Sequence, residues 1–563
     1  MYIRVKSTPN SPRKSVQIVE GKRDAITGKV KQKIVRHVGI AMDASEEQKL
    51  KDLGREIISK LEVARAVEAS QDSLFPIEST DIAPVAKRGR PAKKRLSEVL
   101  PPDQVSLMDV VEEKRIIEGI HEVGGRVFDD MYGQLCGTKK LSTSQYGRLR
   151  DVVLARLANP CSKHKTQDEL LRHFDRSHNL DALYRMMDKV HGHIDLVKQL
   201  TFSKTQGLFP NGVDVLLFDV TTLYFESVTN DDLRAYGYSK DHRFNTTQVV
   251  LALANNQEGL PVGYELFPGN KAEVGTLVKA VDHWRTLFAI NDVCFVGDRA
   301  MMSKENIALL ERRGYHYVIA AKLKGLPKAL QQQILDRDYY HPTLLDQSLG
   351  WVGEFTYQGQ RLVVSYKQRR AEKDAKDRQR ILDKLEKQLG QQGSSNKLIT
   401  NAGIKQYTRV EHSTAYIDQD KIDQAKAWDG LHGVITNITD EDPTKLIARY
   451  ARLWRIEESF RINKHTLKMR PIFHFKPERI QAHIAVCYMA FSVLRHMEYQ
   501  VGLTQKLSVN RIIQTLMSVQ ASIYRHKRTR DRYRVPSAFS LEANKIYKAF
   551  NIQRSTDAEP YLK

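Results

Sequence analysis

The sequence contains few cysteines and no cysteine motif. Four cysteines occur among 563 residues, and no two of them form a Cys-x-x-Cys pair. The pattern argues against a disulfide framework and against a thiolate zinc site. It suits a protein of a reducing cytoplasm.

Long apolar runs are also missing. The most hydrophobic stretch, residues 484–494, lies between His483 and Arg495 and is far too short to cross a bilayer, so it predicts a buried helix. The first residues lack the apolar run of a signal peptide. We therefore expect a cytoplasmic protein with no membrane partner.

Acidic residues are outnumbered by basic ones. Lys and Arg number 89 against 67 Asp and Glu, which gives a formal net charge of +22. Such an excess favours a polyanionic partner, because cations that neutralise phosphates release the counterions bound there. Nucleic acid is the leading candidate.

The length predicts roughly three to four domains. Alternating β-branched residues followed by a helical period predict a small N-terminal α+β module over 1–70. Residues 71–105 are rich in Ser, Pro and Lys without any period, and predict a basic linker. Within it, Arg88 and Arg90 flank a glycine in a segment that resembles the core of an AT-hook, which reads a narrow A·T-rich minor groove. The alternative is a linker that stays solvated.

Residues 106–206 have a helical pattern with breaks at Asn159-Pro160 and near Gly192. Segment 141–173 pairs an apolar-faced helix with a basic turn and a second helix, which suits helix-turn-helix docking in a major groove. Plain helical scaffolding is the alternative. We predict a helical domain, with DNA binding as one of its two interpretations.

Residues 207–324 predict an α/β core. Three consecutive strands joined by short turns favour an antiparallel meander, and two later strands that alternate with helices favour parallel pairing. That is the strand order of an RNase H-like fold, so we expect a mixed five-stranded sheet with helices. The core is expected to resume over 445–500.

Two further regions flank the returning part of the core. Strand-like pieces around a charged helix at 367–389 predict a mostly β insertion subdomain over 325–444. Residues 501–563 predict a helical and basic C-terminal region. Its run 524–534 interleaves aromatic and basic residues, which suits either phosphate binding or a solvated basic face.

Two aspartates stand at costly positions in the core. Asp219 interrupts an apolar strand, and Asp298 follows Gly297 at the end of another. In the expected topology the two strands are neighbours, so both carboxylates would reach one metal ion. The alternative for each aspartate is a strand-end turn or a helix cap.

Glu457 stands out through its helical spacing. Tyr450, Glu457 and Lys464 are seven residues apart, and each step falls only about 20° short of two full turns, so one helix would project all three from one face. Glu458 would point about 100° away. The alternative is a plain ion pair between Glu457 and Arg461 on a solvated face.

Together these residues resemble the DDE transposases of bacterial insertion sequences, in the group with a Tyr-Arg-Glu-Lys signature. Tyr450, Glu457 and Lys464 match its spacing, and FDVTTLYFES, GLPVGYELFPGNKAE, GDRAMMS and KMRPIFH extend the resemblance over most of residues 200–500. The position of the signature arginine holds Leu453. We hypothesise that Arg461, about 40° around the helix from Glu457, supplies the missing cation.

The resemblance implies metal-dependent phosphoryl transfer on DNA without a covalent protein intermediate. Asp219, Asp298 and Glu457 would hold two Mg²⁺ ions, for which Mn²⁺ is an expected substitute. Tyr450 and Lys464 would contact phosphates near the cleaved end. The expected partners are double-stranded DNA, as element ends and target, and a second copy of the chain on paired ends, in a bacterial cytoplasm at the nucleoid.

The expected function is that of a transposase that binds the ends of its element, cuts them and joins them to a target. A nuclease that cuts without joining is one alternative. A catalytically inactive DNA-binding regulator derived from a transposase is the other; the intact set of three acids argues against it, and Leu453 favours it.

Overall fold

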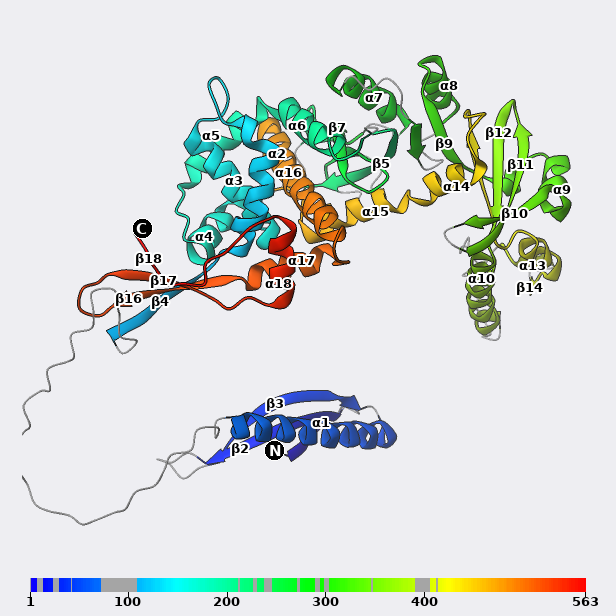
Figure 1. Ribbon diagram of the computed structural model, residues 1–563. Coiled ribbons are helices and arrows are strands. Elements are labelled where there is room, and N and C mark those ends of the chain that lie inside the picture. Colours follow the sequence, from blue (N-terminus) through cyan, green and yellow to red (C-terminus); the bar gives the residue numbers. More distant parts are fainter. Residues whose placement is uncertain are drawn as a thin grey trace, which may run out of the picture. The chain divides into compact units, whose positions relative to one another are not determined.

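The computed structural model describes residues 2–7, 14–23, 30–41, 43–71, 109–210, 213–225, 230–236, 246–270, 274–288, 294–297, 303–345, 348–389, 406–411 and 414–562. The chain divides into two compact units, residues 1–99 and residues 100–563 (Figure 1). The segment expected to be a linker, with Arg88 and Arg90, lies outside the described residues.

The N-terminal unit is a small α+β module, as its sequence pattern predicts. Its sheet has the order β1-β2-β3 with antiparallel pairing, and the helix packs against β2 and β3. Val16, Ile18 and Val19 of β2 are buried in this module. Its elements are β1 (Tyr2–Ser7), β2 (Lys14–Arg23), β3 (Val30–Ala41) and α1 (Ala44–Gln71).

The larger unit begins with a helical region. Ser142 caps α3 in a capping box with Gln145, and the hydroxyl of Ser162 accepts from the backbone N–H of Lys165 at the start of α4, so polar caps set both helix starts. The elements of this region are β4 (Val110–Ile117), η2 (Ile120–Gly124), α2 (Gly125–Tyr132), η3 (Gly133–Leu135), α3 (Thr143–Ala158), α4 (Lys163–Phe174), α5 (Leu180–His191) and α6 (Ile194–Gln206).

A mixed sheet follows, and its five core strands run β9-β8-β5-β6-β7. The strands β5, β6 and β7 pair antiparallel, whereas β8 pairs in parallel with both β5 and β9. The strand order expected for an RNase H-like core is thus present. The core elements are β5 (Val215–Tyr224), β6 (Gln248–Asn255), β7 (Pro261–Pro268), α7 (Val274–Phe288), β8 (Cys294–Gly297), α8 (Lys304–Arg312) and β9 (His316–Ala321).

The sheet does not stop at five strands, so that part of the prediction is wrong. Strand β15 pairs antiparallel with β9, and the full order is β10-β11-β12-β15-β9-β8-β5-β6-β7. The outer edge of β9 would otherwise expose unpaired backbone groups, and β15 covers it. Residues 325–444 therefore extend the core sheet. Their elements, with the turn before them, are η5 (Leu323–Gly325), α9 (Lys328–Leu335), η6 (Arg337–Tyr339), β10 (Tyr340–Leu345), β11 (Ser348–Tyr357), β12 (Gln360–Tyr366), α10 (Gln368–Leu389), β13 (Thr408–Glu411), β14 (Thr414–Ile417), α13 (Gln419–Lys426) and β15 (Leu431–Thr436).

The end of the chain departs from the purely helical patterns expected for 106–206 and 501–563. Strand β4 joins a second antiparallel sheet of order β18-β17-β16-β4. The apolar ends of β4 suit a helix face as well as a strand, and its partner β16 lies far away in sequence. The last elements are α14 (Pro443–Ala451), α15 (Trp454–Arg461), η7 (Ile462–Thr466), α16 (Pro477–Gly502), α17 (Val509–Ser518), β16 (Gln520–His526), β17 (Arg532–Pro536), α18 (Leu541–Ala549) and β18 (Glu559–Pro560).

Helices cover both faces of the core sheet (Figure 1). One face packs Phe218 and Phe295 against Trp284 of α7. The other packs Leu217 and Leu253 into the same core as α14, α15 and α16. Helix α16 is buried along most of its length, as the apolar stretch predicted, and it also contacts α2, α3, α5 and α6. The helical region and the sheet therefore share one hydrophobic core.

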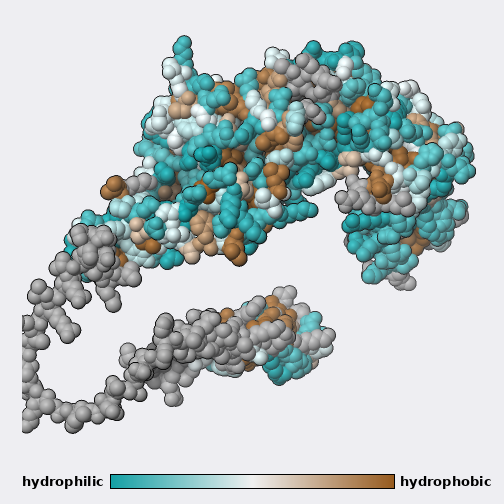
Figure 2. All heavy atoms as spheres, in the orientation of Figure 1, coloured by the Kyte–Doolittle hydropathy of each residue, from teal (hydrophilic) through white to brown (hydrophobic). Residues whose placement is uncertain are grey.

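The surface is mixed in character. Figure 2 shows mostly hydrophilic side chains on the visible face of the larger unit, with apolar ones scattered among them. Over the described residues, no helix combines the length and apolar character needed to cross a membrane.

Candidate active site

Asp219 lies in the middle of β5 and is half-buried. Side chains alternate between the faces of a strand, so Asp219 shares a face with Leu217, whose core includes α14, α15 and α16. Its Oδ1 accepts a hydrogen bond from the backbone N–H of Val220 at 2.7 Å. A carboxylate is thus placed on the sheet face that carries α15.

The second aspartate follows a strand that is directly paired with β5. Phe218 lies opposite Gly297, the last residue of β8, in parallel register. Asp219 and Asp298 are the residues that come next in the sequence on the two strands. Asp298 itself lies outside the described residues, so its position stays a prediction.

Helix α15 is fixed to the sheet by a buried polar contact. The side-chain amide of Asn255, at the end of β6, donates to Ser459 Oγ at 2.6 Å, and that hydroxyl donates to the carbonyl of Arg455 at 2.8 Å. Both Asn255 and Ser459 are fully buried. Since Ser459 lies two residues after Glu457, this contact helps to set the position of the helix segment that carries Glu457.

Glu457 is exposed and borders a cavity of about 330 Å³. Among the described residues, no hydrogen bond or ion pair involves its carboxylate. The alternative of a pair with Arg461 is wrong, since Arg461 instead contacts Glu458 at 3.5 Å. The lining residues of the cavity are Ser365, Lys367, Arg370, Gly430, His432, Ile447, Tyr450, Ala451, Leu453, Trp454 and Glu457.

Three residues of this lining were missed by the sequence reasoning. Lys367, Arg370 and His432 come from the inserted segment, and they face the cavity together with Glu457. Burial, and then the positive charges of Arg370 and Lys367, lower the pKa of His432 to about 4, so this imidazole is neutral at pH 7. The one sequence signal for these residues was the basic start of the charged helix at 367–389. Because that helix was assigned to a separate subdomain, it was not expected to lie near the core.

The prediction of one continuous helix through Tyr450, Glu457 and Lys464 is wrong. Helix α14 ends before α15 begins, and the backbone N–H of Leu453 bonds the carbonyl three residues earlier, in a tightened turn. In a regular helix Leu453 would point about 120° away from Ile447. Both are buried.

The broken helix still keeps part of the predicted set together. Tyr450 and Glu457 border the same cavity, and the Tyr450 ring lies 5.0 Å from the ring of His432. Lys464 lies in the π-helical turn η7, is half-buried and is not among the residues that line the cavity.

Leu453 occupies the position of the signature arginine and packs in the core with 9 % exposure. A cation at that position would need a partner inside the core. The flanking arginines are already engaged: Arg452 pairs with Glu258 at 2.8 Å, and Arg455 stacks over the ring of Trp454 at 4.3 Å.

Glu458 has a structural role. Its carboxylate lies 3.2 Å from Nη1 of Arg495, a buried guanidinium that also donates to the carbonyls of Glu258 and Gly259. Arg461 reaches the same glutamate, but 70 % of its side chain is exposed. Glu458 therefore belongs to an ion-pair network, whereas Arg461 keeps its guanidinium accessible to a ligand.

The carboxylates suit a divalent cation by their chemistry, because hard ions such as Mg²⁺ prefer oxygen ligands. Asp219 is a half-buried carboxylate on the face that carries α15, and Glu457 is an accessible one on α15. Within the described part of the chain, no three His, Cys, Asp or Glu side chains gather into a metal-binding group. The expected third ligand, Asp298, falls outside that part.

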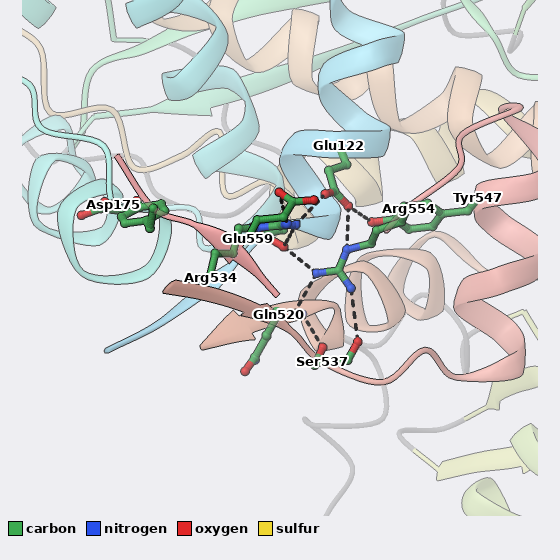
Figure 3. Close-up of polar contacts among 10 residues, drawn as sticks. Glu122, Asp175, Gln520, Arg534, Ser537, Tyr547, Arg554 and Glu559 are labelled. Carbon is green, nitrogen blue, oxygen red and sulfur yellow. Dashed lines mark hydrogen bonds and ion pairs between the residues drawn. The ribbon is translucent and has the colours of Figure 1, made fainter. Parts of the chain in front are cut away.

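Part of the basic run 524–534 is paired with acids, whereas residues 527–530 of its turn are exposed. It forms β16, β17 and their turn, and Arg532 Nε lies 2.9 Å from Glu113 of β4. Arg534 Nη2 donates to Glu118 at 2.7 Å. Figure 3 shows Arg534 and Arg554, which come from different segments, both pairing with Glu122, and Arg534 also pairing with Glu559.

These contacts form a compact group of half-buried charges, the C-terminal ion-pair cluster, which we define as Glu118, Glu122, Arg534 and Arg554. Burial alone would raise the pKa of Glu118, but its hydrogen bonds from Arg534 and Arg554 hold it below the usual value. The cluster ties the C-terminal strands to the loop after β4.

Comparison with protein families gives two matches. The family model "Transposase DDE domain" matches residues 210–493, about half of the chain and all of the core sheet. The model "IS1634 family transposase, N-terminal domain" matches residues 3–66, which form the N-terminal module. Among curated protein sequences, none matches this chain.

Two solved structures are similar at a low level. A piggyBac transposase synaptic complex with hairpin DNA has a TM-score of 0.35 and 9 % identity, over 71 % of this chain and 77 % of that chain. A Mos1 transposase paired-end complex with the left transposon end has a TM-score of 0.14 and 11 % identity, over 32 % of this chain and 61 % of that chain. Scores this low leave the fold assignment to the sheet topology itself.

Proposed function

The chain belongs to the family of transposases with a DDE domain and is the transposase of an insertion sequence; from this premise we propose that Asp219, Asp298 and Glu457 are its catalytic carboxylates. The observation that carries the proposal is the position of two of them. Asp219 lies on the sheet face covered by α15, and α15 presents Glu457, which has no ion pair or hydrogen bond with the described residues, at a cavity.

DDE transposases use divalent metal ions, and we propose two Mg²⁺ ions here, with Mn²⁺ as a substitute, held by these three side chains. When bound, such ions activate water or a terminal 3′-hydroxyl and stabilise the leaving oxygen. The chain itself contributes positioning. The contact between Asn255 and Ser459 holds α15 against the sheet, so Glu457 is kept beside the strand that carries Asp219.

Cations near Glu457 suit binding of the DNA backbone. Lys367 and Arg370 border the same cavity, so a phosphodiester placed there would meet positive charge from the inserted segment. We propose that Tyr450, Lys464 and the exposed Arg461 also contact phosphates near the cleaved end. Arg88 and Arg90 are proposed to contact an A·T-rich minor groove.

The proposed partners are double-stranded DNA, as the two element ends and a target, and a second copy of the chain on paired ends. The proposed location is the bacterial cytoplasm, at the nucleoid. Sedimentation of the protein alone and with element-end duplexes would test the assembly. A single copy on both paired ends would contradict it.

The decisive experiment follows cleavage and strand transfer on the DNA that flanks the coding sequence, with Mg²⁺ or with EDTA. Glu457→Gln and Asp219→Asn should each lower metal-dependent cleavage by about 10³-fold or more while DNA binding in EDTA persists. Glu386→Gln, an exposed glutamate of α10, is the matched control and should retain activity.

Each alternative function has its own outcome in this assay. Cleavage without joined products would identify a nuclease, and specific binding without any cutting would identify a regulator. Full activity of Glu457→Gln would remove that residue from the catalytic set.

A further inference from the structure

A second cavity lies between the start of α4 and the loop that leads into α16. Its volume is about 290 Å³, and its lining includes Arg156, Lys163, Lys468, Arg470 and two histidines of that loop and helix. It contains no Asp or Glu. We call this cavity the Lys163 pocket.

Lys163 is the unusual residue of the pocket. It is 3 % exposed, and its ammonium contacts His483 Nδ1 at 3.4 Å. His483 Nε2 lies 3.2 Å from the carbonyl of Met469, which requires an N–H there and leaves Nδ1 as the acceptor. A neutral imidazole is thus the polar partner of a buried cation. No carboxylate within the described residues forms an ion pair with Lys163.

The neighbouring groups add positive charge. Arg156 is 5 % exposed and donates to the carbonyls of Leu467, Lys468 and Cys161, so its hydrogen bonds go to backbone oxygens. Burial, and then the charge of Arg156, lower the pKa of Lys163 to about 7. A buried cation normally has an anionic partner, and the described residues that line this pocket supply none.

The position of the pocket adds a further attraction for anions. Lys163 is the first residue of α4, a helix of 12 residues, so the partial positive charge of that helix N-terminus lies at the pocket. His164, Lys468 and Phe473 of the lining are exposed, which leaves the pocket open to a ligand from solvent. The volume suits a phosphate with part of its sugar rather than a folded segment.

We propose that the Lys163 pocket binds a phosphate of the DNA backbone, with Lys163 as the main charge partner. The inference rests on the proposed function for its choice of DNA as the source of the phosphate. It places a DNA contact in the region 106–206, at the basic turn between α3 and α4. The contact is to the backbone, so it carries no sequence preference.

The first test measures thermal unfolding of the full chain in sodium phosphate and in sodium chloride of equal ionic strength. Phosphate should raise the melting temperature of wild type and of Lys165→Met, an exposed lysine of the same helix. It should not raise that of Lys163→Met. Equal phosphate shifts in all three proteins, or none in wild type, would overturn the pocket.

The second test measures binding to an element-end duplex and to an unrelated duplex in EDTA. Lys163→Met should bind both about tenfold more weakly, with a slope of log K against log salt that is smaller by about 1, whereas Lys165→Met should match wild type. Unchanged DNA binding by Lys163→Met would overturn the assignment to DNA, even if its phosphate shift is lost. Failure of wild type to bind either duplex would instead refute the proposed function.

A second variant guards against misfolding of Lys163→Met. Removal of an unpaired buried charge should leave the chain folded. If Lys163→Met nevertheless fails to fold, Lys468→Met replaces an exposed cation of the lining and is subjected to the same two assays. If Lys468→Met matched wild type in both assays, the proposed phosphate binding in the pocket would be wrong.

Discussion

The Lys163 pocket and the C-terminal ion-pair cluster both bury basic side chains, but only the cluster places carboxylates against them. Arg554 is 3 % exposed as a side chain and has Glu118 and Glu122 as partners. Lys163, equally buried, has a histidine nitrogen. A basic run whose charges are matched within the chain stabilises the fold, whereas an unmatched buried cation indicates a ligand.

The largest expected effect is in the cluster. Glu118→Gln should lower the free energy of unfolding by about 3–5 kcal/mol, because it leaves Arg534 and Arg554 buried without their main anion. Glu113→Gln, whose partners are more exposed, should cost less than about 1 kcal/mol. Urea unfolding of both variants measures the difference. Equal losses of unfolding free energy in Glu118→Gln and Glu113→Gln would contradict the distinction between the cluster and its more exposed surroundings.

The two regions should also respond to pH in different windows, although stability rises with pH in both. The pKa of Lys163 is about 7 in the folded chain against 10.5 for the free side chain, so the unfolded chain binds more protons between these values and stability rises with pH across that window. The pKa of Glu118 is below 4.5, so its contribution is present above that pH and is lost as the pH falls below it.

The unfolding free energies of wild type and Lys163→Met, compared above neutral pH, therefore test the contribution of this lysine. The difference in unfolding free energy between wild type and Lys163→Met should change by an amount on the order of a few kcal/mol from pH 7 to pH 10, with wild type gaining. Glu118→Gln should keep the wild-type slope in that window. Parallel curves for wild type and Lys163→Met would show that folding does not lower the pKa of Lys163.

The smallest effect on stability is expected for an exposed cation. Arg461→Ala should change the free energy of unfolding by less than about 0.5 kcal/mol, since its side chain is 70 % exposed and its contact with Glu458 is long. Cleavage of element ends should nevertheless fall about tenfold, if a charge-assisted contact to phosphate is lost. Arg312→Ala, an exposed arginine of α8, is the control. Intact cleavage by Arg461→Ala would exclude Arg461 as the substitute for the signature arginine.

Much of the core was predictable from the sequence because its signals are local. Strand alternation, short turns and the Asp442-Pro443 start of α14 specify elements through neighbouring residues. The RNase H-like strand order followed from the order of those elements. The pairing of β15 with β9 and of β4 with β16 did not, because each depends on an edge that only the folded sheet presents.

The candidate site was predictable in part for the same reason. Asp219 and Glu457 were identified by their residue type and their local setting, without knowledge of contacts. The helix break at Leu453 was missed, since a seven-residue spacing assumes an unbroken helix. The cavity residues Lys367, Arg370 and His432 were missed because strands of the inserted segment join the core sheet, which sequence period does not reveal.

The sequence by itself determined the family resemblance, the carboxylates proposed for catalysis and the positive charge that suits DNA, since these depend on residue types and short spacings. Only the tertiary structure decided which basic residues are already neutralised. Lys163 and His483 are 320 positions apart, and Glu118 and Arg534 are 416 positions apart. Burial and charge pairing arise from contacts between distant segments, so Arg532 and Arg534 of the basic run 524–534 proved to be paired within the chain, whereas Lys163 at a helix start has no acidic partner among the described residues.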